Sequence, residues 1–205
     1  MEVTLTIQQK RSESTMKITT IGLDIAKSVF HFFAVNQMGR YVKKKQLKRA
    51  QLLSYFARLE PCLVAMEACG GANHWARALK ELGHEVKLIA PQYVKPFVKG
   101  NKNDYNDAEA IAEAAQRPNM RFVPIKSVEQ QDIQNLHRQR ERIKKARTAL
   151  VNQTRGLLAE YGVVINKGVT AVRTRLPEVL EDADNGLTVR SREVFAQLLE
   201  ELREF

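Results

Sequence analysis

Four carboxylates stand in three short segments that lie far apart in the 205-residue sequence. Asp24 is inside the apolar run IGLDIAKSVF (21–30), Glu67 ends the run CLVAME before two glycines, and Asp104 and Asp107 are three residues apart in DYNDAEAIAEAAQR. An unpaired carboxylate inside an apolar strand is costly. Converging carboxylates cannot all ionise unless a cation neutralises them, and hard divalent ions such as Mg²⁺ prefer carboxylate oxygens.

Such a site has an obvious chemistry. Two ions, Mg²⁺ or Mn²⁺, held about 3.5–4 Å apart can stabilise both the attacking and the leaving oxygen of a phosphodiester. The sequence therefore predicts metal-dependent phosphoryl transfer, with the four carboxylates as metal ligands and catalytic residues. Simpler interpretations stay open, because Asp104 and Asp107 could be ordinary first-turn carboxylates stabilised by a helix dipole, and Glu67 a loop acid.

The elements that must position these residues follow from the periodicity of the chain. Residues 17–25, 28–36 and 41–47 predict a three-stranded antiparallel meander, with turn residues at Asn36 and Gly39. Helices and strands then alternate, with helices over 48–60, 73–83 and 104–117, strands over 62–68 and 84–90, a basic loop over 92–103 and a short extended piece over 119–123. This order predicts an α/β fold, a ribonuclease-H-like (RuvC-like) mixed sheet with flanking helices, over residues 17–126. Its central first strand carries Asp24 beside the strand that ends in Glu67.

Residues 127–205 predict a helical segment of another kind. Leucine or isoleucine recurs every seven residues at 136, 143, 150 and 157, which indicates one seam of a coiled coil. The complementary seam, Ile133 followed by Arg140, Arg147 and Thr154, is poor and favours packing in a larger helical assembly. Residues 161–177 predict a loop or short-helix break, and residues 191–205 another amphipathic helix. We expect this helix to continue into a C-terminal domain that is missing here, and residues 1–16 to be a disordered tail.

The charge of the chain favours a polyanionic partner. The net charge is +10 and the pI is about 9.7, as in many nucleic-acid-binding proteins. Candidate phosphate contacts fall in two groups: Lys95, Lys99 and Lys102 beside the acidic helix, and Arg138, Arg140, Arg142, Lys144, Lys145 and Arg147 on the long helix. The lysines of VKKKQLKR lie near an edge strand, where protection of that edge is a rival explanation.

Other classes of protein are disfavoured. Cys62 and Cys69 are too few for a disulfide framework and predict buried, reduced thiols. No apolar run is long enough to span a membrane. We therefore expect a cytoplasmic, nucleoid-associated protein with no membrane partner.

The motifs GLDIAK, MEACGGANHW and NKNDYNDAEAIAEA, in this order and spacing, resemble those of DEDD-type insertion-sequence transposases, the insertion-sequence family one-ten, and of the related pilin-gene invertases. The resemblance covers residue 17 to the end. It implies a DNA transposase, or site-specific recombinase, that cleaves and exchanges DNA strands, with Asp24, Glu67, Asp104 and Asp107 as the metal-binding DEDD set. It further implies a structured guide (bridge-type) RNA, and a homo-oligomer assembled through the coiled-coil segment.

The resemblance also implies a second domain with a serine nucleophile. None of the serines here matches that position, so we assign no nucleophile and expect the enzyme to be incomplete without that domain. An alternative is a non-catalytic nucleic-acid-binding assembly module, or a truncated remnant of such a transposase. GLDIAKS also resembles the first phosphate loop of actin-type and sugar-kinase ATPases, but 25–27 intervene and no second glycine-rich loop follows.

Overall fold

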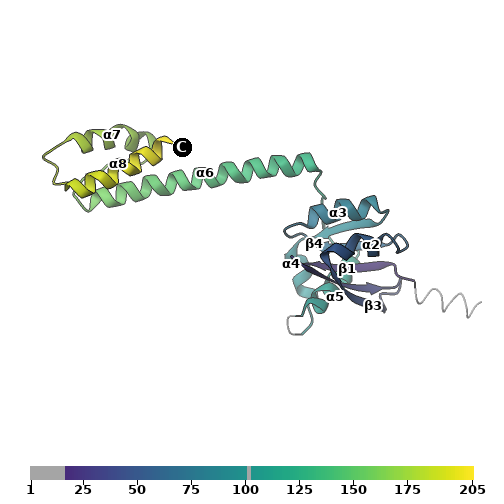
Figure 1. Cartoon of the computed structure of the whole chain (residues 1–205). Coiled ribbons are helices and arrows are strands. Elements are labelled where there is room, and N and C mark those ends of the chain that lie inside the picture. Colours follow the sequence, from purple (N-terminus) through teal and green to yellow (C-terminus); the bar gives the residue numbers. More distant parts are fainter. Residues whose placement is uncertain (1–16, 101–102) are drawn as a thin grey trace, which may run out of the picture. The chain divides into compact units, whose positions relative to one another are not determined.

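The computed structural model describes residues 17–100 and 103–205. The chain divides into two compact units, with the boundary in the sequence between Ser127 and Val128 (Figure 1). Unit 1 runs to Ser127 and unit 2 is Val128–Phe205. The expected disordered tail and Lys102 lie outside the described residues.

Unit 1 is built on a mixed sheet of six strands in the order β3-β2-β1-β4-β5-β6. The pairs β1–β2, β2–β3 and β5–β6 are antiparallel, whereas β1–β4 and β4–β5 are parallel. The mixed α/β class and the initial meander are confirmed, and the ribonuclease-H-like assignment stays a prediction compatible with this order. The strands are β1 (Thr20–Ile25), β2 (Val29–Val35), β3 (Tyr41–Lys48), β4 (Leu63–Glu67), β5 (Glu85–Ile89) and β6 (Phe122–Val123).

The alternation of side chains along β2 explains how the sheet is covered. Phe30, Phe32 and Ala34 are fully buried on one face, in one apolar cluster with residues of α2 (Leu52–Phe56) and α3 (Ala72–Glu81). The helix predicted over 48–60 is shorter than expected, since a 3₁₀ turn, η1 (Arg49–Gln51), precedes α2. His31, Phe33 and Val35 point to the other face, which α5 (Asp104–Ala115) covers (Figure 1).

Helix α5 lies unusually close to β1 because β1 carries a glycine there. A Cβ atom on Gly22 would stand 2.1 Å from the Ala108 carbonyl oxygen and 2.4 Å from the Ala112 backbone nitrogen. The buried face of α5 is also lined with alanines. The sequence therefore allows a helix backbone to rest directly on the strand that carries Asp24.

The stretch predicted as a basic loop is partly helical. Residues Pro91–Val94 form α4 and Lys95–Phe97 form the 3₁₀ turn η2. Pro91 occupies the first helical position, where its missing N–H costs nothing and its fixed φ suits the helix. The proline that ends the preceding strand thus also starts a helical turn.

Unit 2 consists of α6 (Val128–Ala159), α7 (Val169–Glu181) and α8 (Val189–Arg203). The stretch over 161–177, predicted as a loop or short-helix break, is helical in its second half, because α7 begins at Val169 and continues through Pro177 to Glu181. Proline in a helix interior removes a hydrogen bond, but α7 buries Val172, Leu176 and Val179 in the core shared with α6 and α8. This packing outweighs the local preference to stop.

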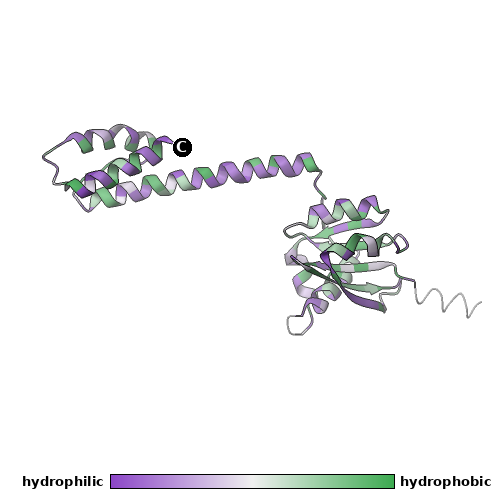
Figure 2. Cartoon of the chain, viewed as in Figure 1, coloured by the Kyte–Doolittle hydropathy of each residue, from purple (hydrophilic) through white to green (hydrophobic). Residues whose placement is uncertain are grey.

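Helix α6 is buried over only part of its length. Its buried residues begin at Leu150, and its first two-thirds are largely hydrophilic (Figure 2). Within the expected heptad seam only Leu150 is buried, while Leu136 is 71% and Ile143 36% exposed. The coiled coil is therefore not formed within the chain and stays a prediction. Among the described residues, no helix combines the length and the apolar character that crossing a membrane requires.

Candidate active site

Asp24 and Glu67 reach the same end of the sheet on neighbouring parallel strands. The register pairs Leu23 of β1 with Met66 of β4, and Asp24 and Glu67 are the next residue of each strand. Both carboxylates are partly exposed, unlike the fully buried Leu23 and Met66 that precede them. The parallel pairing thus delivers two acids to the carboxyl ends of the two central strands.

Asp104 and Asp107 reach this end on the first turn of α5. The helix begins after Asn103, whose side chain accepts a hydrogen bond from the Tyr105 backbone N–H at 3.0 Å. Acids in a first turn are stabilised by the helix dipole, so this position suits them structurally as well. The close approach of α5 to β1 at Gly22 brings the helix N-terminus beside Asp24.

The carboxylates from these three segments interact electrostatically. The pKa of Asp24 is raised from 3.8 to about 6, first by burial and then by Asp107 and Asp104, with a smaller contribution from Glu67. The pKa of Glu67 is also raised, by burial and then by Asp107. The structure therefore brings the four acids predicted from sequence into one electrostatic cluster.

His31 is a member of this site that the sequence reasoning missed. It is the direct cross-strand partner of Asp24, it is 8% exposed, and its Nδ1 lies 3.5 Å from Oδ2 of Asp104 without forming a hydrogen bond. Its ring packs edge-on against Tyr105 at 4.8 Å between centroids. The position of His31 could have been predicted from the meander, because a hairpin centred between residues 27 and 28 places residue 24 opposite residue 31.

A hollow of about 280 Å³ opens beside the acids. Its lining includes Glu67 and Asp107, together with Lys95 of η2 and residues of α4. Lys95 is exposed, and its ammonium is available for an anionic group held at this place. Of the lysines predicted near the acidic helix, Lys95 is the one that the structure places at the hollow.

The other lysine described in this stretch is engaged elsewhere. Lys99 forms an ion pair with Glu113 at 2.7 Å, and Glu113 also pairs with Arg117 at 2.5 Å. Glu113 lies in the last turns of α5, away from Asp104 and Asp107 in the first. Lys102, the third lysine, belongs to the part of the chain that is not described.

Of the two cysteines expected to be buried thiols, only one is. Cys62 is buried, and burial raises its pKa to about 11. Cys69 is exposed, which corrects the expectation. The pKa of Cys69 is raised by partial desolvation and then by Glu67 and Asp24, so its thiol borders the acidic cluster.

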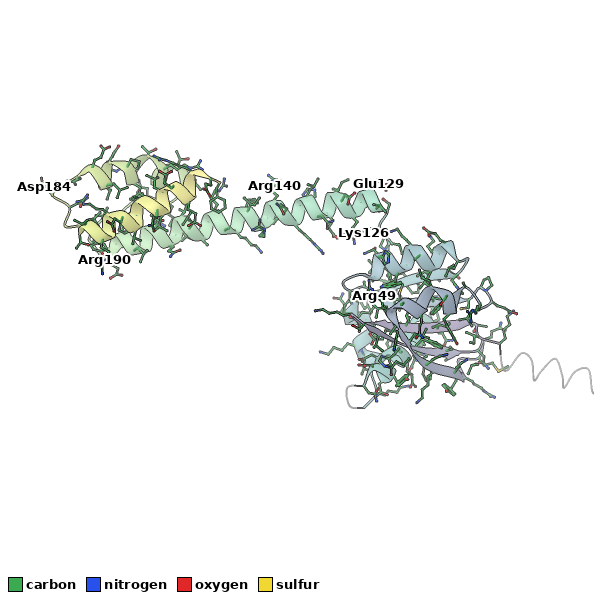
Figure 3. The ribbon with its side chains drawn as sticks, viewed as in Figure 1. Arg49, Lys126, Glu129, Arg140, Asp184 and Arg190 are labelled. Carbon is green, nitrogen blue, oxygen red and sulfur yellow. The ribbon has the colours of Figure 1, made fainter. Side chains whose placement is uncertain are left out.

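The predicted basic group of the long helix lies along α6 in unit 2. Its members are exposed apart from Arg147, which is half-buried, and Figure 3 shows Arg140 midway along the helix. One of them, Lys144, pairs with Glu141 at 3.0 Å. The remaining charges run along the helix: Arg138, Arg140, Arg142, Lys145 and Arg147.

The chemistry of the donor set fits a hard divalent ion, since all four acids offer carboxylate oxygens. Within 17–100 and 103–205, however, no three His, Cys, Asp or Glu side chains are already gathered closely enough to hold one metal ion. The partly exposed carboxylates would therefore have to turn toward a shared ion. Neighbouring acids contribute to the raised pKa values of Asp24 and Glu67. A bound cation would neutralise this repulsion between the carboxylates.

Comparison with known proteins identifies the family. A family model described as "Transposase", for DEDD transposases of the IS110 type, matches residues 21–163. A "Probable family 20 transposase" of Pseudomonas aeruginosa is 51% identical over 189 residues, which is 92% of this chain and 56% of that protein. The transposase for insertion sequence element IS1111A of Coxiella burnetii is 48% identical over 198 residues, which is 97% of this chain and 54% of that protein.

A putative transposase of Sinorhizobium fredii is 44% identical over 191 residues, covering 93% of this chain and 49% of its own length. The chain thus spans about half the length of the curated relatives it matches. No solved structure matches it. With a family match over most of the sequence and several close relatives, the chain belongs to the IS110 family of transposases.

Proposed function

We propose that this chain supplies the metal-dependent, strand-cleaving part of a DNA transposase. The proposed metal ligands and catalytic residues are Asp24, Glu67, Asp104 and Asp107. Bound Mg²⁺ or Mn²⁺, in two positions, would polarise the scissile phosphodiester and stabilise the charge that develops on its oxygens. The proposed site is cytoplasmic and associated with the nucleoid, where its DNA substrate lies.

The observation that carries this proposal is the convergence of acids from three separate segments on one end of the sheet. Asp24 has its pKa raised to about 6, with contributions from Asp107, Asp104 and Glu67 after the burial contribution. Without a cation, the mutual repulsion of these like charges lowers the stability of the fold. A requirement for a divalent ion explains why the acids are there.

Residues around the site have distinct roles in the proposed reaction. The four carboxylates hold the ions, and His31, which is 3.5 Å from Asp104, limits where that carboxylate can turn. Lys95 at the hollow can pair with a phosphate oxygen next to the one being cleaved. Tyr105 closes the β2 side of the site by packing on His31.

The partners of the transposase are also part of the proposal. The basic residues of α6 would bind the phosphate backbone of DNA and of a structured guide RNA through sequence-independent contacts. The exposed Leu136 and Ile143 of α6 would pack against a second copy of the chain as a coiled coil. A serine nucleophile is not assigned to this chain.

Calorimetric titration of Mn²⁺ into the chain tests the proposal. The variants Asp24→Asn and Glu67→Gln are compared with Glu81→Gln, a control that removes an exposed carboxylate of α3. We expect saturable binding in wild type and in the control, and its loss in both site variants. Binding that survives in either site variant would show that the acids do not share a metal.

A second function follows if the wild type binds no Mn²⁺ even when nucleic acid is present. The chain would then be a non-catalytic nucleic-acid-binding module, or a remnant that retains the fold. The exposed basic residues along α6 favour this alternative. Nucleic-acid binding that is unaffected by Asp24→Asn fits both functions, so the metal titration decides between them.

A further inference from the structure

The edge strand β3 and its flanking turns carry a run of unpaired positive charge. Residues 37–59 contain no acid and seven cations: Arg40, Lys43, Lys44, Lys45, Lys48, Arg49 and Arg58. In the described part of the chain none of the seven pairs with a carboxylate. Protection of a strand edge explains charges on the strand itself, but not the absence of any acid over 23 residues or the arginines beyond the strand (Arg49 is labelled in Figure 3).

The pleat of β3 divides its lysines between the two faces of the sheet. Leu47 is buried in the apolar cluster under α2 and α3, and Lys43 and Lys45 share its face, with their ammonium groups over the Tyr55 ring at 5.8 and 4.8 Å. Lys44 and Lys48 therefore point to the opposite face, where α5 lies. Accordingly, the Lys44 ammonium lies over the ring of Tyr105, 5.2 Å from its centroid.

That face of β3 is in register with the carboxylate site. Gln46 pairs with His31 across β2–β3, and His31 pairs with Asp24 across β1–β2. Lys44 and Lys48 stand two residues to either side of Gln46. Since strands are about 4.8 Å apart, the backbone of Gln46 is roughly 10 Å from that of Asp24, and the two lysines flank this row.

We propose that Lys44 and Lys48 bind the phosphate backbone of the DNA strand whose scissile phosphate the carboxylates hold. This inference rests on the proposed strand-cleaving function and adds the direction from which the strand reaches the site. The strand runs over the α5-facing side of β3, passes Tyr105 and His31, and enters at Asp24. Phosphates reach the acids only with their charge neutralised nearby, and the two lysines supply that charge on the side opposite Lys95.

Several observations favour a nucleic acid over an acidic protein. The two lysines are four residues apart on one extended strand, about 13 Å, so they match a polyanion with regularly repeated charges. An aromatic ring, Tyr105, lies beside one of them, as is common where a nucleic-acid strand is held. DNA is the partner we assign, because the acids next to this surface are those proposed to cleave DNA.

The test compares two double variants of the 205-residue chain that remove the same charge from opposite faces of the same strand. Lys44→Gln with Lys48→Gln changes the proposed surface, and Lys43→Gln with Lys45→Gln is the matched control. Binding to a fluorescent 30-base-pair DNA duplex and to an RNA hairpin of similar length is measured in EDTA over a series of salt concentrations. Circular dichroism verifies that both variants are folded.

The proposal gives different results for the two variants. The α5-facing pair should weaken DNA binding about 10- to 100-fold near 0.1 M salt and reduce the slope of log K against log salt by about 1.8, since each phosphate contact contributes about 0.9. The control pair should leave that slope within about 0.5 of wild type. Equal losses for both pairs, no loss for either, or a loss confined to RNA would each overturn the proposal.

These measurements are independent of cleavage. Because they are made in EDTA, the difference between the two faces can hold even when the Mn²⁺ titration finds no metal site. The proposed strand-cleaving function would then fail while the DNA surface on β3 stands. If instead the chain binds Mn²⁺ but the two double variants bind DNA equally well, the strand-cleaving function stands and only the proposed DNA path over β3 is refuted.

Discussion

Replacing Asp24 by asparagine should stabilise the fold when no metal is present. The pKa of Asp24 is raised from 3.8 to about 6, so the folded state binds more protons than the unfolded state between these values. Stability is then lost as the pH rises through that window, and the loss levels off above about pH 7, once folded Asp24 is also ionised. An asparagine side chain does not ionise in this range, so the Asp24→Asn variant escapes this cost.

The magnitude follows from the displacement of the pKa. At 1.36 kcal/mol for each pH unit, a change from 3.8 to about 6 corresponds to at most about 3 kcal/mol. Asp24 is partly exposed, and solvent screening reduces such contributions. We therefore expect Asp24→Asn to raise the free energy of unfolding by about 1–2 kcal/mol at pH 7.5, or the Tm by about 3–8 °C.

Urea unfolding in EDTA at pH 7.5 and at pH 4 measures this effect, with Glu81→Gln as the exposed-acid control. The stabilisation should shrink to near zero at pH 4, where folded Asp24 is already protonated. Saturating Mn²⁺ should reverse the order of the two proteins, because a ligand at 100 times its Kd adds about 2.7 kcal/mol to the form that binds it. A variant that is neutral or destabilised at pH 7.5 without metal, or equally stabilised at pH 4, would refute the raised pKa of Asp24.

Three further predictions test the scaffold and the helix charges. Gly22→Ala should destabilise unit 1 by about 3 kcal/mol in urea unfolding, because overpacking against backbone atoms cannot relax easily, whereas Gly156→Ala, an open helical position with nothing within 4 Å, should be stabilising by up to about 1 kcal/mol; equal effects would contradict the close approach of α5 to β1. His84→Leu should cost about 2–3 kcal/mol, since His84 bonds a backbone N–H and a backbone carbonyl that are buried with it, and thermal unfolding measures the loss; an unchanged Tm would mean that solvent satisfies these groups. Replacing Arg140, Arg142 and Lys145 together with alanine should reduce the slope of log K for RNA binding against log salt by about 2. An unchanged slope would show that these three residues do not contact the RNA.

Much of unit 1 could be predicted because its signals are local. Val, Ile and Phe alternate with small or polar residues in the meander, and Asn36 and Gly39 mark its second turn. In the structure the Asn36 side chain accepts hydrogen bonds from the backbone of Met38 and Arg40, and Gly39 has a φ of 72°. Chemistry that depends on one residue and its neighbours can be seen in sequence.

The parts that could not be predicted depend on contacts between distant residues. The ion pair of Lys99 with Glu113 joins a loop to a later helix turn, and no spacing rule links positions 14 apart. Helix α7 continues through Pro177 because of a core contributed by all three helices of unit 2, which a local reading of proline misses. The heptad spacing of Leu136 and Ile143 predicted a packed seam on α6, but both side chains are exposed within the single chain.

The register of the meander connects the acids to the lysines of β3. A slip of one residue would turn every side chain of a strand to the other face, so Asp24 would enter the apolar cluster under α2 and α3. Leu47 would leave that cluster, and a lysine would replace it. Burial of Phe30, Phe32 and Leu47 on one face therefore fixes where Asp24, His31 and Lys44 point. The same apolar packing that folds the sheet thus places Asp24, His31 and the side chain of Lys44 on the face that α5 covers.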